Sequence, residues 1–157
     1  MTTYQWLLGL HVIAAFLFVS GGVTAGIFHT VALGRDRPSE VAALLRLSRA
    51  GVAVNGVGAI AVLVLGIWLV DYLPGYGFGD AWIIAALALW VASGVPAAIG
   101  GRSLRKAREL AERLAAEGDV PSPELRGMVA DRTALVLNYL SFAMVLAILG
   151  LMIWKPA

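Results

Sequence analysis

Long stretches without any charged side chain dominate this sequence and leave few folds open to it. About 20 apolar residues form a helix long enough to cross a hydrocarbon core of about 30 Å. Backbone groups in lipid must pair within their own segment, and the alternation typical of a membrane β-barrel is absent, so these stretches favour helices. We predict an all-α fold, a transmembrane four-helix bundle forming one integral membrane domain. The predicted spans cover residues 5–33, 50–70, 81–101 and 133–154.

Composition supports this prediction. The 157 residues are 60% hydrophobic and 14% charged, whereas soluble domains have about 45–50% apolar and about 25% charged residues. The chain has no cysteine, which excludes disulfides, thiolate metal sites, iron–sulfur clusters and thiol catalysis. No basic residue precedes the first apolar stretch, and that stretch is longer than the apolar part of a signal peptide, so we expect it to be retained.

The basic residues gather on one side of the predicted spans. Of the 12 Lys and Arg residues, 11 lie in the connections 35–49 and 102–132, and the connection 71–80 has none. Because cytoplasmic loops are rich in Lys and Arg, we expect these two connections in the cytoplasm and both termini outside. Aromatic residues that prefer the membrane interface gather at the opposite, outer ends of the spans, at Tyr4, Trp6, Trp68, Tyr72, Tyr76, Trp82 and Trp154.

Two helical extensions are predicted on the cytoplasmic side. Residues 102–118 place Leu104, Ala107, Leu110 and Leu114 on one stripe and contain opposite charges four residues apart, which is typical of an amphipathic helix. Its arginines favour contact with anionic membrane lipids and not with nucleic acid. A further helix is expected to be capped by Ser122, with Pro123 at its first position, and to run unbroken to Lys155.

The predicted spans contain no charged residue, which argues against a pump or transporter that uses buried carboxylates. Polar residues inside the membrane are costly, and therefore they are the candidates for function. The polar residues inside the spans are His11, His29, Asn55, Asn138 and Ser141. The last three are expected to form hydrogen bonds between helices.

The two histidines lie 18 residues apart, which is five helical turns, so they share one face about 27 Å apart. Small residues between them form a groove that would admit a flat macrocycle or a neighbouring helix. The functional interpretation is a haem b site with His11 as axial metal ligand and His29 as a second cofactor-binding candidate. Opposite His11, the iron would take Met144, Met152, a residue of a second protomer, or water. The alternative is that His11 only bonds a neighbouring helix and His29 reaches the inner interface.

Residues 6–22, W-L-L-G-L-H-V-I-A-A-F-L-F-V-S-G-G, and the ending L-M-I-W-K-P-A resemble a group of bacterial four-span predicted integral membrane proteins of unknown function. That group is similar to HemJ-type protoporphyrinogen oxidases and to the CopD copper-resistance domain. In the HemJ type, a histidine early in the first helix is associated with haem, and a second lies near the end of that helix; His11 and His29 match them. Lys155-Pro156 resembles the terminal Lys-Pro. The A-G-I-F stretch before His29 and a third span without a basic residue depart from the HemJ pattern, so the resemblance implies haem binding more than oxidase activity.

Three functions remain open, and the sequence does not decide whether the chain is an enzyme. The first is a haem b protein with redox activity toward a porphyrin or quinone. The second is an accessory or structural subunit of a membrane assembly, or a homo-oligomer, suggested by the absence of buried charge and by many glycines. The third is copper handling, implied by the CopD resemblance, for which two histidines and four methionines are a thin ligand supply.

Overall fold

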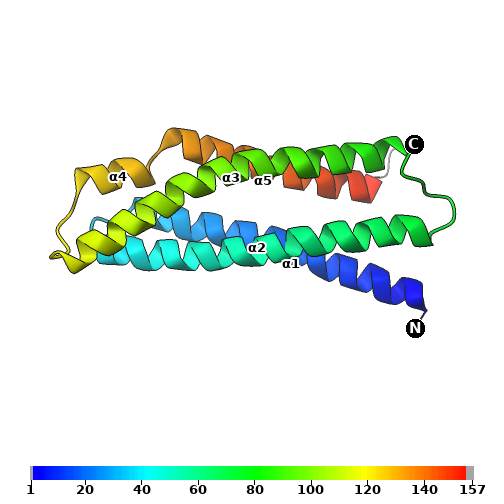
Figure 1. Cartoon of the computed structure of the whole chain (residues 1–157), viewed down its shortest axis with the longest axis horizontal. Coiled ribbons are helices and arrows are strands. Elements are labelled where there is room, and N and C mark those ends of the chain that lie inside the picture. The colour runs from blue at the N-terminus through cyan, green and yellow to red at the C-terminus, as the bar shows by residue number, and fades with distance from the viewer. Residues whose placement is uncertain (1, 155–157) are drawn as a thin grey trace.

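The computed structural model describes residues 2–154 and contains no strand within that range. Four long apolar helices confirm the predicted all-α transmembrane bundle. In Figure 1, α1 runs beside α2 and α5 runs beside α3, and the start of α1 and the end of α5 lie at the same end of the molecule. The helices are α1 (Thr3–Leu33), α2 (Pro38–Tyr72), α3 (Ala81–Ala116), α4 (Pro123–Val129) and α5 (Arg132–Trp154).

The two ends of the bundle differ. We name the end at which α1 and α3 begin and α2 and α5 end the open end. We name the opposite end the crown; it comprises the end of α1, the start of α2, the last turns of α3, and α4 (Figure 1). Most of the buried apolar residues of the crown belong to one cluster, which includes the predicted stripe residues Ala107 and Leu110. The crown is therefore packed like a small soluble domain, although the spans beside it expose many apolar side chains.

Glycines bring α1 and α2 into backbone contact. A Cβ atom added to Gly58 would lie 2.7 Å from Phe18 Cα, and one added to Gly51 would lie 2.8 Å from the Ala25 backbone nitrogen. Membrane helices that approach this closely gain dispersion contacts and admit hydrogen bonds between helices. One such bond is donated by Asn55 Nδ2 to the Phe18 carbonyl at 2.5 Å.

Polar contacts also connect the other helices. Ser141 Oγ donates to the Ser93 carbonyl at 2.9 Å, which joins α5 to α3. Asn138 on α5 packs so closely on Gly100 that a Cβ there would lie 3.0 Å from Asn138 Cγ. Trp90 Nε1 on α3 donates to the Ala59 carbonyl on α2 at 3.2 Å. The hydrogen bonds of Ser141 and Trp90 each satisfy a side-chain donor that lipid cannot satisfy.

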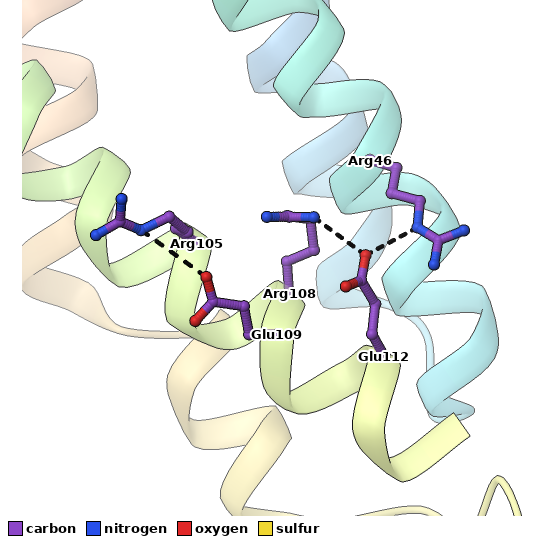
Figure 2. A network of polar contacts seen from close by, with 5 residues as sticks. All are labelled: Arg46, Arg105, Arg108, Glu109 and Glu112. Carbon is purple, nitrogen blue, oxygen red and sulfur yellow. Dashed lines mark hydrogen bonds and ion pairs between the residues drawn. The ribbon is translucent and has the colours of Figure 1, made fainter. Parts of the chain in front are cut away.

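Ionic contacts secure the crown (Figure 2). The Glu112 carboxylate lies 2.8 Å from Arg46 Nε on α2 and 3.1 Å from an Arg108 nitrogen on α3. The hydrogen bond from Arg46 is the main reason why the pKa of Glu112 is lower than its usual value. A second carboxylate, Asp119, accepts from the Ser39 backbone nitrogen and from Ser39 Oγ, both at 2.7 Å, and these bonds lower its pKa. Both carboxylates therefore tie the end of α3 to the start of α2.

The prediction of one unbroken helix from Ser122 to Lys155 is wrong. Ser122 does cap a helix, accepting from Leu125 N at 3.4 Å, and Pro123 begins it, but α4 ends at Val129. The interruption turns α4 so that Leu125 and Val129 are buried in the crown. Asp131 then accepts from the Thr133 backbone nitrogen at 2.9 Å, immediately after the start of α5. Lys155 lies outside the described residues.

Candidate functional site

His11 faces α2 from the third turn of α1 and is only 9% exposed. It fits there because α2 has a glycine opposite: a Cβ added to Gly66 would lie 3.1 Å from His11 Cε1 and 3.6 Å from Nδ1. His11 Nδ1 is fully covered and has no hydrogen-bond partner among residues 2–154. The backbone carbonyl of Val62, one turn before Gly66, lies near the ring. The imidazole is thus held by packing and not by a hydrogen bond to Nδ1.

An unpaired buried polar atom of this kind costs about 1–3 kcal/mol. Histidines that bind metals usually turn one ring nitrogen toward a carboxylate or backbone carbonyl and use the other for the metal. In His11, Nδ1 is covered on the side of Gly66 and has no hydrogen-bond partner among residues 2–154, although the Val62 carbonyl lies close to the ring. A ligand to His11 would therefore have to use Nε2, because Nδ1 is covered.

A cavity of about 400 Å³ adjoins His11 at the open end. This volume lies within the range of about 300–1,000 Å³ that is typical of small-molecule pockets. All four long helices and the connection between α2 and α3 contribute to its walls, which are almost entirely apolar. The walls include His11 and Ala15 on α1, Gly66 on α2, Trp82 and Trp90 on α3, and Met152 on α5.

The cavity lies between two helices that scarcely touch. In the middle of the bundle α1 and α5 approach each other, since a Cβ on Gly22 would lie 3.6 Å from the Phe142 ring. Toward the open end they diverge (Figure 1), and both line the cavity there. Beside it, Val12 on α1 is 58% exposed and Ile153 on α5 is 73% exposed. The cavity therefore has a side that faces the apolar surroundings of the bundle.

The structure places the predicted site residues in different parts of the bundle. Met152 lines the cavity with His11, whereas Met144 does not. His29 is 5% exposed in the crown, with Nε2 3.0 Å from the Val129 carbonyl, so one of its nitrogens already has a partner. Between the two histidines, α2 occupies the small-residue groove at Gly21 and Gly51. The three other polar candidates Asn55, Asn138 and Ser141 lie at helix contacts.

Sequence reasoning missed two residues of the site. Trp90 lines the cavity and also bonds the Ala59 carbonyl, and Gly66 makes room for the imidazole. A tryptophan in the interior of the third span, away from the interface that this residue prefers, was a usable signal for Trp90. Gly66 is one of 18 glycines, and only the position of His11 across from it distinguishes it.

Few side chains that could bind a metal line the cavity. Residues 2–154 contain no group of three or more His, Cys, Asp or Glu side chains placed to hold a metal ion. The cavity offers one imidazole and one thioether. Haem brings four nitrogen ligands of its own and commonly takes His, or His with Met, from the protein. These residues therefore suit a metal held in a macrocycle better than a bare ion.

A bundle of four apolar spans with its cavity inside the spanning region defines an integral membrane protein. The family described as "Predicted integral membrane protein (DUF2269)" matches residues 5–156, and the chain belongs to that family. This finding confirms the resemblance to predicted integral membrane proteins, while the similarity to HemJ and CopD proteins stays a prediction. No curated protein and no solved structure is significantly similar to the chain.

Proposed function

We propose that this protein binds haem b within the membrane, with His11 as an axial ligand to the iron. One observation carries the proposal: a buried imidazole whose Nδ1 lacks a partner adjoins an apolar cavity of about 400 Å³. A neutral imidazole in apolar surroundings is a suitable iron ligand, because it needs no counter-charge.

Met152 supports the same proposal, because its side chain lines the cavity from another helix. His with Met is a known axial pair, and it raises the reduction potential of haem. When bound, haem supplies one-electron chemistry, and the protein supplies orientation and a dry environment. The apolar side of the cavity between Val12 and Ile153 suits an electron partner that is dissolved in lipid, such as a quinone or a porphyrin.

Two single substitutions test the haem proposal. Protein purified in mild detergent from haem-replete cells is expected to show a Soret band. His11→Ala removes an axial ligand and is expected to abolish that band, whereas His29→Ala is expected to retain it, because His29 bonds Val129 in the crown. Haem content per protein is measured by pyridine haemochrome. A colourless wild-type preparation, or a band that survives His11→Ala, rules the proposal out.

We further propose that the crown lies in the cytoplasm and the cavity lies near the outer surface of a bacterial inner membrane. Support comes from the charge distribution, because 11 of the 12 basic residues belong to the segments that form or border the crown, and cytoplasmic segments retain Lys and Arg. The open end carries the interfacial aromatic residues Tyr4, Trp68, Tyr72 and Trp82.

The absence of native cysteine allows a clean test of this orientation. In intact cells, a membrane-impermeant maleimide is expected to label a Gly79→Cys variant in the connection between α2 and α3. The same reagent is expected to label a Glu117→Cys variant, at the exposed end of α3, only after the cells are permeabilised. The opposite labelling pattern would invert the topology. Copper handling and an accessory-subunit role stay predictions, since no particular contact within residues 2–154 favours either.

A further inference from the structure

The basic residues of the protein divide into two groups according to their partners. Seven of the eleven basic residues from 35 to 132 lie near a carboxylate: six form ion pairs within 4.0 Å, and Arg37 acts electrostatically on Asp119; we name these seven the crown cations. The others form no ion pair with any residue from 2 to 154. We name this second group the boundary cations; it consists of Arg49, Arg102, Lys106 and Arg132.

Three of the boundary cations, Arg49, Arg102 and Arg132, lie next to the charge-free spans, and Lys106 lies farther into the crown. Arg102 and Arg132 flank the hydrogen bond from Ser103 Oγ to Asp131, which joins α3 to the start of α5 at 3.1 Å. Lys106 lies one helical turn beyond Arg102 on the same face. Arg49 lies on α2 one turn closer to the spans than Arg46, which pairs with Glu112. All four side chains are exposed.

Each helix also presents an apolar side chain one turn deeper in the span. Val52 follows Arg49 and is 54% exposed, and Ile99 precedes Arg102 and is 49% exposed. Val136 follows Arg132 and is 64% exposed. A cation above an exposed apolar side chain matches a molecule that has an anionic head and a hydrocarbon chain. A free phosphate ion would contact only the cation and not the apolar side chain.

We propose that the boundary cations bind the phosphate headgroups of anionic phospholipids, so that the protein selects such lipids around the crown end of its spans. Each basic residue near an anionic lipid surface contributes favourably to binding. The nearby Asp131 carboxylate carries one negative charge against the four positive charges of the boundary cations, so it offsets them only in part. The crown cations contribute less, because carboxylates neutralise them. This inference does not depend on haem binding.

The test compares two variants that each lose four positive charges. Purified protein is exchanged into nanodiscs of equimolar phosphatidylglycerol and phosphatidylcholine, and the lipid retained after gentle detergent extraction is quantified by mass spectrometry. Wild-type protein is expected to be enriched in phosphatidylglycerol. Replacing the boundary cations by glutamine is expected to lower this preference by about tenfold or more. The control variant carries Arg35→Gln, Arg37→Gln, Arg113→Gln and Arg126→Gln in the crown and is expected to keep most of the preference.

The lipid preference of the unmodified protein is also measured at different salt concentrations. This second measurement does not depend on whether a variant folds. Raising the salt from 0.1 M to 1 M shortens the Debye length from about 10 Å to about 3 Å, so the preference is expected to fall. Inorganic phosphate at millimolar concentration is expected to leave it unchanged. Equal lipid preference in wild type and boundary variant, equal losses in both variants, insensitivity to salt, or displacement by inorganic phosphate would each overturn the proposal.

Discussion

Gly58→Ala is expected to destabilise the protein by about 1–3 kcal/mol or more, because the new methyl group has no room. The Cβ atom would lie 2.7 Å from Phe18 Cα and 2.8 Å from the Leu17 carbonyl carbon. Both atoms belong to the backbone of α1, which cannot move away as a side chain end can. The two helices must separate, and the hydrogen bond from Asn55 to the Phe18 carbonyl is then strained.

Gly56→Ala provides the matched control two residues earlier on α2. A Cβ there meets no atom within 4 Å, so the free energy of unfolding is expected to stay within about 0.5 kcal/mol of wild type. Both variants are compared by unfolding in mixed micelles with increasing sodium dodecyl sulfate, followed by tryptophan fluorescence. Similar midpoints for Gly58→Ala and wild type would show that α1 and α2 do not meet as described.

Gly66→Leu is expected to remove bound haem while the bundle stays folded. The Cβ would lie 3.1 Å from His11 Cε1 and 3.6 Å from Nδ1, and the rest of the leucine side chain must enter the space of the imidazole or of the cavity. Because the neighbouring atoms belong to a side chain, the helices need not separate. The haem-to-protein ratio is expected to fall nearly as far as in His11→Ala, with unchanged circular dichroism.

Two further variants show whether the loss comes from the site. Gly66→Ala asks His11 to shift by only a few tenths of an ångström and is expected to retain most of the haem. Gly94→Leu places the same large side chain where a Cβ meets nothing within 4 Å, and it is expected to retain all of it. If wild-type protein binds haem and Gly66→Leu binds it equally well, the haem lies elsewhere in the bundle.

The helices were predictable because charge and hydropathy act locally. Asp80 immediately precedes α3, and the cap at Ser122 follows from one hydroxyl and the proline after it. Arg49 and Arg102, which limit the charge-free stretches, lie inside α2 and α3, because a charged residue ends an apolar stretch without ending the helix. The interruption after Val129 was not predictable in this way. It depends on burial of Leu125 and Val129 in the crown and on a carbonyl that His29 meets from 100 residues away.

The candidate site was predictable only in part. Polarity inside a span singled out both His11 and His29, and helical periodicity placed them on one face. What distinguishes them is the partner of each ring: Val129 bonds His29, whereas His11 Nδ1 has none among residues 2–154. The cavity lies where α1 and α5 diverge, and the course of α1 is set by its close contacts with glycines on α2. These contacts join residues far apart in the sequence, so no local sequence pattern predicts the cavity.

The contrast between the two ends has a mechanical consequence. The ion pairs and apolar cluster of the crown hold both halves of the chain together, so a separation of α1 from α5 at the open end would pivot about the crown, with α1 still packed on α2 and α5 on α3. Such a separation would let a ligand enter or leave the cavity sideways, from the lipid. The crown would stay closed during this exchange, so no path across the membrane would open.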